Sequence, residues 1–421
     1  MIAVKMVFIM YTIYSLYTLF VFLVSDYKMY HAILGLLCVW LTYIAFRLGL
    51  NFNKNVYPDF NCELNKEHIS FPLSDINRWS PVKYFFVALI DWLFAVLSAK
   101  FYTGRGFFSV LKGAFGGDSA YYTYQEYFLS NQLKSFSIEK IPYILMNAFI
   151  TIILIWSVIS LLSIKRKKWY NIVFVFLVVL AYLYFGASRG TNFEVYIVFI
   201  LCIFCLIKKM QECSPHKKIV YIGSAAVSAF LMVFIYQARI SDRGLSLAYS
   251  ICPEIHFASN SFLGEYFPVM TKTFLSFFSY LGYGIYCIGV SVGDICMSSI
   301  RGLVSMSVPG GFFLISEESM HEMIKKTINV QARWIPDMVD FVDTFGFVLY
   351  FCCMFFLGCF LKNVMCGSYS VFLKNLIQVV ITIEMLSLPV GNFLVTSSSN
   401  KIMVLFLLLF FIKSRYRISL Y

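Results

Sequence analysis

Apolar stretches long enough to cross a membrane recur along the whole sequence. The candidate spans are residues 6–24, 32–46, 84–98, 143–164, 170–187, 192–207, 219–237, 341–361, 370–390 and 401–413. A transmembrane helix needs roughly 20 apolar residues, so we expect the shorter runs to extend into their flanks. Because 60% of the 421 residues are hydrophobic and only 13% are charged, the chain is too apolar for a soluble fold. The sequence predicts an all-α polytopic integral membrane protein with about 10 (10–12) transmembrane helices.

The positive charge of the chain indicates how these spans are oriented. Much of the net charge of +12 comes from lysine and arginine clusters between spans, at 165–168, 208–218 and 413–417. Such clusters are typical of cytoplasmic loops under the positive-inside rule. Following the chain from one span to the next then places both termini in the cytoplasm. Since the positive charge is explained in this way, we do not expect nucleic acid as a partner.

Two loops on the opposite side of the membrane are unusually long. They cover residues 99–142 and 238–340 of what we expect to be a single transmembrane domain, 1–421. Loops of this length inside a compact domain usually carry function. Within the second loop, residues 272–293 are apolar enough to form another span, which would invert the orientation of everything after it. The glycines and tyrosines of this stretch favour a membrane-associated helix at the interface instead.

Arginines at the ends of two candidate spans are the clearest functional signal. Arg189 follows the fifth span, and Arg239 and Arg243 follow the seventh at a spacing that shares one helical face. All three lie on the non-cytoplasmic side, where the positive-inside rule disfavours arginine. Guanidinium groups bind phosphate oxygens in pairs and keep their charge, so the set could bind a diphosphate at the membrane surface. Each arginine taken singly could equally anchor a helix end at the membrane interface. Glu194 is also close enough in sequence to pair with Arg189.

Carboxylates and histidines in the long loops are candidates for acid–base chemistry. Asp118 follows two glycines in the first loop. Asp337 precedes the eighth span, and Asp343 lies at its start. His321 lies in the second loop, in a segment that also fits an amphipathic surface helix. A carboxylate or imidazole beside a diphosphate could act as a general base, whereas Asp343 more simply caps the helix start. The sequence contains no metal-binding motif, and we expect no metal and no other cofactor.

Charged residues inside the candidate spans form another group. Asp91 lies in the third span, Glu194 near the start of the sixth, and Glu384 in the ninth. Intramembrane ionisable groups usually have a functional role. Asp91 and Glu384 could carry protons in a transporter, or they could hold the helices together through buried pairing.

Tyrosines gather just after Asp118, at positions 121, 122, 124 and 127. Their rings could stack on sugars, and Tyr124 is among the further candidate site residues. The same residues also fit an aromatic belt at the membrane interface, and both interpretations stay open.

Four features in this order resemble the bacterial O-antigen polymerases (Wzy-type), members of the oligosaccharide repeat-unit polymerase class. They are Gly116-Gly117-Asp118 followed by Tyr121, Tyr122 and Tyr124, the span end Phe185-Gly-Ala-Ser-Arg-Gly190, the pair Arg239 and Arg243, and Asp343-Thr-Phe-Gly346 with Gly358. Together they cover about residues 115–360, and each motif is short. The related O-antigen ligases carry a late external histidine that is not evident before Gly346, where Arg333 and Trp334 stand instead. This difference favours a polymerase and leaves the base unassigned.

The resemblance implies a metal-independent glycosyltransferase at the periplasmic face of the bacterial inner membrane. Its substrates would be two undecaprenyl-diphosphate-linked oligosaccharides, and a chain-length regulator protein could bind it. Arg189, Arg239 and Arg243 would stabilise the leaving diphosphate, with Arg333, Glu194 and Tyr124 as further candidates. His321, Asp337 and Asp118 are the candidates for the base, in no fixed order.

Two other functions fit parts of the pattern. An O-antigen ligase would use the same donor but transfer the chain to a lipid A core. A polysaccharide flippase or exporter would move the lipid-linked sugar without covalent chemistry. A flippase predicts charged residues throughout a central cavity, whereas the arginines here favour one side of the membrane and the external loops are long.

Overall fold

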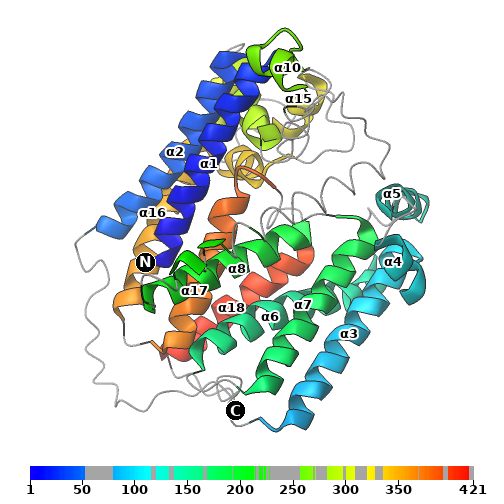
Figure 1. The fold of residues 1–421 in the computed structure, drawn as a ribbon. Helices are drawn as coiled ribbons and strands as arrows, with labels where there is room; N and C mark the ends of the chain where they lie inside the picture. Colours follow the sequence, from blue (N-terminus) through cyan, green and yellow to red (C-terminus); the bar gives the residue numbers. More distant parts are fainter. Residues whose placement is uncertain are drawn as a thin grey trace. The chain divides into compact units, whose positions relative to one another are not determined.

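The computed structural model describes residues 1–52, 79–114, 120–131, 137–164, 168–191, 193–212, 214, 218–220, 222–223, 227, 257–268, 271, 282–296, 300–308, 320–327, 335–367, 369–391 and 397–416. In these residues the regular secondary structure is helical, without a strand, apart from one isolated β-bridge between Ser25 and Phe257 (Figure 1). The predicted all-α fold is therefore confirmed for this part of the chain. The chain divides into two compact units, and each is described by itself.

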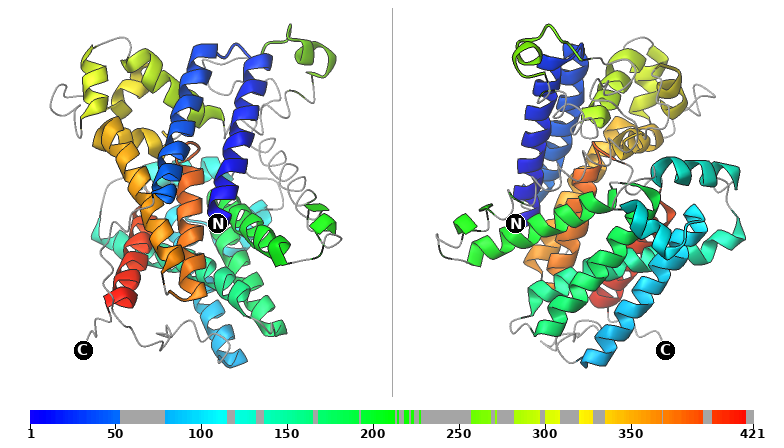
Figure 2. Two further views of the ribbon diagram at one scale, coloured as in Figure 1. Left: turned by 90° about the vertical axis from the view of Figure 1, so that its left-hand side faces the viewer. Right: turned by 45° about the vertical axis from the view of Figure 1, so that its right-hand side comes forward.

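The first unit contains the N-terminal helices and the long helix after residue 336. It comprises Met1–Lys54, Leu245–Ser368 and Val380–Thr396. Its helices are α1 (Ile2–Val24), α2 (Met29–Asn51), α10 (Phe262–Tyr266), the π-helix η3 (Ser291–Ile295) after helical residues 282–290, α13 (Ile300–Ser307), α15 (Met320–Thr327) and α16 (Asp337–Cys366). Both views in Figure 2 show α1 and α2 side by side, and α2 also packs along α16.

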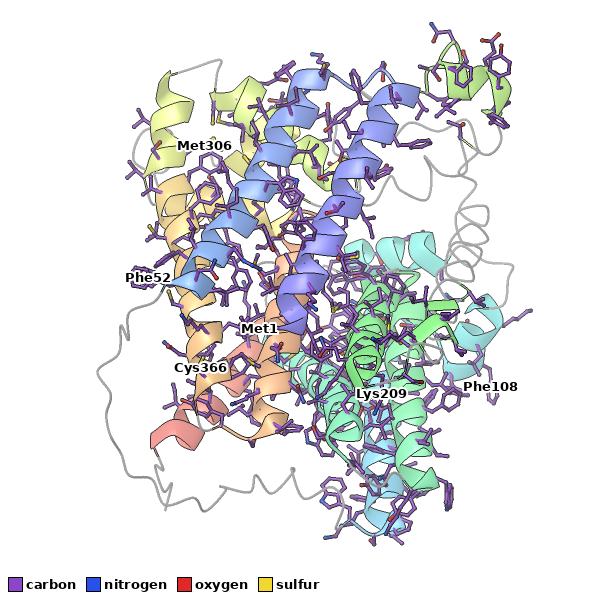
Figure 3. All side chains as sticks on the ribbon, turned by 60° about the vertical axis from the view of Figure 1, so that its left-hand side comes forward. Met1, Phe52, Phe108, Lys209, Met306 and Cys366 are labelled. Atoms are coloured by element: carbon purple, nitrogen blue, oxygen red, sulfur yellow. The ribbon has the colours of Figure 1, made fainter. Side chains whose placement is uncertain are left out.

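The contact between α2 and α16 depends on glycine. A Cβ at Gly49 would overlap the backbone of α16, and one at Gly358 would overlap the backbone of α2. Cys359 Sγ lies 3.4 Å from the Gly49 carbonyl oxygen, and Lys362 Nζ donates to the carbonyl of Phe52, labelled in Figure 3, at 3.0 Å. Small residues let two membrane helices approach this closely. Such close packing matters in lipid, because no hydrophobic effect drives helices together there.

A break at Gly346 divides α16. Gly346 has φ 72° and ψ 163°, a conformation that only glycine adopts without strain, and a Cβ there would lie 2.8 Å from the Val308 amide nitrogen. The helix begins at Asp337, earlier than the expected span 341–361, with Pro336 at its N-cap. Asp343 therefore lies inside the helix and does not cap its start, and the Asp-x-x-Gly pattern marks the break.

The second unit contains most of the central part of the sequence. It comprises Asn55–Gly244, Tyr369–Val379 and Ser397–Tyr421. Its helices are α3 (Pro81–Thr103), α4 (Phe107–Ala114), α5 (Ala120–Ser130), the 3₁₀-helix η2 (Ile138–Lys140), α6 (Ile141–Ser163), α7 (Trp169–Arg189), α8 (Phe193–Glu212) and α18 (Ser398–Tyr416). One more helix, α17 (Val371–Ser387), begins in this unit and ends in the first.

Parallel packing of α3 and α7 organises the second unit. The rings of Tyr84 and Phe174 lie 5.1 Å apart near the helix starts. Further along, Trp92 Nε1 donates to the Leu177 carbonyl at 3.1 Å, and the Trp92 ring lies 5.6 Å from that of Tyr184. Residue numbers rise together along both helices, so α3 and α7 end on the same side of this unit.

Six of the described helical segments are long and apolar enough to cross a membrane. They are α1, α2, α3, Ile138–Ser163, α7 and α16, which correspond to six of the expected spans. Helices α8, α17 and α18 lie at the expected spans 192–207, 370–390 and 401–413, while 219–237 lies mostly outside the described residues. The apolar helices support a membrane protein. The total of about 10 spans, the single domain and the orientation stay predictions.

The described parts of both long loops contain short helices. The loop 99–142 holds α4 and α5, and the loop 238–340 holds α10, residues 282–296, α13 and α15. Much of the stretch 272–293 lies outside the described residues, and its part from 282 onward is helical.

The α2–α16 contact can be tested by adding volume at Gly358. We expect Gly358→Val to lower the melting temperature of the detergent-purified protein, because overpacking a tight contact costs about 1–3 kcal/mol. Gly223→Val is the matched control, since a Cβ at Gly223 meets nothing within 4 Å. Unfolding is followed by tryptophan fluorescence. If both variants melt at the wild-type temperature, the close approach of the two helices is not needed for stability.

Candidate functional site

The end of α7 forms a tight, glycine-dependent turn. Gly190 has φ 63° and ψ 22°, and its N–H donates to the Ala187 carbonyl at 3.1 Å. The N–H of Thr191 donates to the Gly186 carbonyl, also at 3.1 Å, and buried Ser188 Oγ donates to the Phe185 carbonyl at 2.7 Å. These bonds satisfy the last carbonyls of the helix, and glycine adopts the left-handed conformation at little cost.

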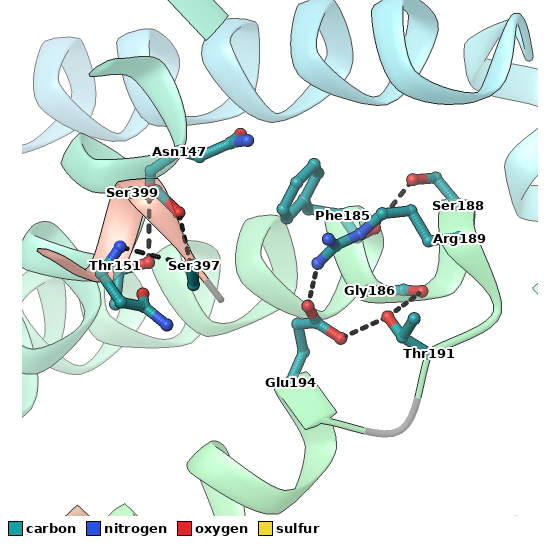
Figure 4. A network of polar contacts seen from close by, with 11 residues as sticks. Asn147, Thr151, Phe185, Gly186, Ser188, Arg189, Thr191, Glu194, Ser397 and Ser399 are labelled. Carbon is teal, nitrogen blue, oxygen red and sulfur yellow. Dashed lines mark hydrogen bonds and ion pairs between the residues drawn. The ribbon is translucent and has the colours of Figure 1, made fainter. Parts of the chain in front are cut away.

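This turn holds Arg189 against Glu194, the second residue of α8. Arg189 Nη2 forms an ion pair with Glu194 Oε1, and Thr191 Oγ1 donates to Glu194 Oε2 at 2.6 Å (Figure 4). The Arg189 guanidinium carbon also lies 4.1 Å from the centre of the Phe185 ring. A Cβ at Gly186 would lie 2.7 Å from Glu194 Cβ, so only glycine lets the carboxylate approach. The pairing expected from the sequence is confirmed.

Burial differs between the two partners. The Glu194 side chain is 4% exposed, whereas the Arg189 side chain is 23% exposed. Arg189 Nε has no hydrogen-bond partner in the described part of the chain. The guanidinium is thus held by a buried carboxylate, and its Nε–H is buried without a partner among the described residues, while the side chain as a whole is partly exposed.

Tyrosines from three helices surround Arg189. Tyr102 of α3, Tyr124 of α5 and Tyr182 of α7 lie within range of its charge, with Tyr124 within hydrogen-bonding reach. Burial raises the pKa of the Tyr124 phenol, and the positive charge of Arg189 opposes this rise. The phenol therefore stays protonated at neutral pH and is available as a hydrogen-bond donor. A cation with neutral donors around it suits an anionic oxygen ligand.

Asp337 belongs to the other unit and sits in a different environment. Its side chain is fully buried at the start of α16, and its N–H donates to the Gly391 carbonyl at 2.8 Å. The Glu384 carboxyl lies within electrostatic range of Asp337, and both Glu384 carboxyl oxygens are buried without a hydrogen-bond partner in the described residues. Two neighbouring buried carboxyls cannot both ionise easily, so such a pair tends to hold a proton.

The remaining predicted site residues lie wholly or partly outside the described residues. Asp118, Arg239, Arg243 and Arg333 lie outside the described residues. His321 is the second residue of α15, and only its backbone belongs to the described part. Among the predicted residues, the structure brings together Arg189, Glu194 and Tyr124.

Sequence reasoning missed Arg105, which follows α3. Its neighbour Gly104 ends the helix with φ 66°, and the Arg105 side chain turns onto α4, where Nη2 donates to the Ser109 carbonyl at 3.1 Å. Arg105 is only 8% exposed. The Gly-Arg-Gly sequence at a span end was the available signal, comparable to Ser-Arg-Gly at 188–190.

No protein-family model, curated protein or solved structure matches this chain. Its function is therefore inferred from the chemistry of these residues.

The Arg189–Glu194 pair can be tested by a double-mutant cycle on thermal stability. Arg189→Gln and Glu194→Gln should each destabilise the protein by about 1–3 kcal/mol, because each leaves one charge unpaired in a largely buried turn. The double variant should lose less than the sum of the two single losses. Arg47→Gln, at an exposed position on α2, serves as the control. Additive losses in melting temperature would contradict the pairing.

Proposed function

We propose that this chain is an O-antigen polymerase, an enzyme that joins oligosaccharide repeat units carried on undecaprenyl diphosphate. The observation that carries the proposal is Arg189, held at the end of an apolar helix by Glu194 and surrounded by tyrosine hydroxyls. A lipid-linked diphosphate presents its charge at this depth, because its chain lies in hydrocarbon and its sugars in water. The resemblance of the span end at 185–190 to Wzy-type polymerases supports the same assignment.

In the proposed reaction the growing chain leaves its carrier and joins the next unit. The bond between the anomeric carbon and the diphosphate oxygen breaks, and the acceptor hydroxyl oxygen forms the new glycosidic bond. The hydroxyl proton passes to a base, and both electrons of the broken bond leave with the diphosphate. Positive charge at the leaving group lowers the barrier, a role proposed for Arg189 together with Arg239 and Arg243. The proposal is metal-independent, since arginine supplies this charge.

His321, Asp337 and Asp118 remain the proposed bases. Asp337 has Glu384 nearby, a second carboxyl with which it could share a proton. Tyr124 is proposed to donate to a phosphate or sugar oxygen, and Arg333 to add positive charge. Glu194 is proposed to orient Arg189 rather than to react.

The proposed location is the bacterial inner membrane, with the site at the periplasmic face and both termini in the cytoplasm. This orientation follows from the basic clusters at 165–168 and 208–218. The proposed partners are the two lipid-linked substrates, the bilayer and a chain-length regulator.

Asp91 favours a second candidate function, a flippase or exporter of lipid-linked polysaccharide. Its side chain is fully buried in α3, and neither carboxyl oxygen has a hydrogen-bond partner in the described part of the chain. A buried, unpaired carboxyl within a membrane helix is typical of proton-coupled transport. Arg189 at the helix end is the stronger observation, because a diphosphate-binding cation there serves transfer chemistry directly.

The proposal is tested by the length of the polysaccharide on a lipopolysaccharide gel. We expect deletion of the gene to leave core lipid with a single repeat unit, and the wild-type gene to restore the ladder. Arg189→Ala should fail to restore it, as should Arg239→Ala and Arg243→Ala, at matched expression. Arg47→Ala, an exposed arginine on α2, should restore it fully.

Each other outcome has a distinct meaning. Bare core lipid in the deletion strain would reject the polymerase and indicate ligation or flipping. A ladder restored by every arginine variant would leave the polymerase standing and remove the proposed arginine site.

A further inference from the structure

The ends of α3 and α7 bring two arginines to the same side of the second unit. Arg105 follows α3 and Arg189 ends α7, and the two helices run parallel. Each arginine interacts electrostatically with a tyrosine of the other helix: Arg189 with Tyr102, and Arg105 with Tyr184. The two cations therefore belong to one polar region at the end of this helix pair.

The charges of these arginines are balanced differently. Arg189 is neutralised by Glu194. Arg105 forms no ion pair with an acidic side chain in the described residues, where its contacts are the Ser109 carbonyl at 3.1 Å and Ser109 Oγ at 3.5 Å. Among the described residues, the uncompensated positive charge of this region therefore comes from Arg105.

Arg105 is nevertheless buried, and burying a positive charge without a nearby carboxylate is energetically unfavourable. Its side chain is 8% exposed, and Nη1 is buried without a hydrogen-bond partner in the described part of the chain. A Cβ at Gly113 would overlap Nη2, so glycine leaves the guanidinium its place beside α4. Burying a cation without a counter-charge is costly, and a bound anion would offset that cost.

A second buried donor lies beside Arg105. The Tyr184 side chain is 5% exposed, and its hydroxyl also lacks a partner in the described residues. The Tyr184 ring contacts those of Trp92 and Phe107, at 5.6 and 5.4 Å. Next to Phe107, Phe108 is 82% exposed, and Figure 3 shows it projecting from α4. Two unsatisfied donors beside an aromatic wall suit an anion that carries an apolar chain.

We propose that Arg105 and Tyr184 bind a phosphate group of a polyprenyl diphosphate, whose isoprenoid chain lies against Phe107 and Phe108. This inference rests on the proposed function and adds a binding site that the arginines expected from the sequence do not include. Phosphate could also reach the site as a phospholipid headgroup or as a free ion, so the experiment has to distinguish these sources.

Binding is measured on the full-length protein in dodecyl maltoside, a detergent without phosphate. Isothermal titration calorimetry with farnesyl diphosphate should show binding that Arg105→Gln weakens tenfold or more. Tyr184→Phe, which removes a single oxygen atom, should weaken it about threefold, in keeping with one lost hydrogen bond. Arg47→Gln, an exposed arginine on another helix, should bind as the wild type does.

Competition identifies the source of the phosphate. Inorganic pyrophosphate should bind more weakly than farnesyl diphosphate and still depend on Arg105, because it lacks the isoprenoid chain. Dioctanoyl phosphatidylglycerol should compete poorly. If it binds as tightly as farnesyl diphosphate and depends equally on Arg105, the site holds a bilayer headgroup and the diphosphate assignment is wrong.

The remaining outcomes separate this inference from the polymerase itself. Unchanged affinity in both Arg105→Gln and Tyr184→Phe overturns the site, even if the gel confirms a polymerase. If Arg105→Gln does not yield folded protein, Tyr184→Phe alone decides, and wild-type affinity in that variant overturns the site. Loss of binding in these variants, combined with bare core lipid after gene deletion, keeps the site and rejects the polymerase.

Discussion

A charge at the end of a membrane helix has to be compensated locally, and the second unit is organised around this requirement. Arg189 closes α7, a helix apolar enough to span a bilayer, and its charge is compensated there by the buried Glu194 carboxylate. The left-handed Gly190 reverses the chain so that α8 returns its carboxylate to the arginine, and Gly186 leaves room for it. The short sequence from 185 to 194 thus contains the residues that hold one guanidinium at the end of an apolar helix.

Packing of α3 against α7 places the Arg189–Glu194 pair within a larger polar region. Aromatic contacts along the two helices keep them parallel, so Arg105 and Tyr102 reach the end at which Arg189 lies. The two arginines differ in what satisfies them, since Arg189 pairs with Glu194, whereas Arg105 has no carboxylate partner among the described residues. A region with one neutralised and one uncompensated cation carries net positive charge while limiting the cost of burial, and this combination suits reversible binding of an anion.

The sequence predicted features that depend on neighbouring residues and missed those that depend on distant ones. Apolar runs predicted the helices, and five residues of separation predicted the Arg189–Glu194 pair. The start of α16 at Asp337 was missed because an acidic first turn made the apolar run look shorter. Arg105 was missed because its importance arises from the register of α3 against α7, which is about 80 residues away along the chain and set by ring packing that no local pattern reveals.

The Glu194 carboxylate would compete with a diphosphate for the Arg189 guanidinium. A phosphate that approaches Arg189 competes with the buried Glu194 carboxylate already bound to the guanidinium, whereas Arg105 has no carboxylate partner in the part of the chain that the structure describes. Under the proposed function, the first contact would therefore be favoured at Arg105. Full engagement of Arg189 then requires its accessible side or displacement of Glu194, whose oxygen is still bonded to Thr191. This order would keep Arg189 neutralised until a substrate is in place, so that its charge acts on the leaving diphosphate rather than on any passing anion.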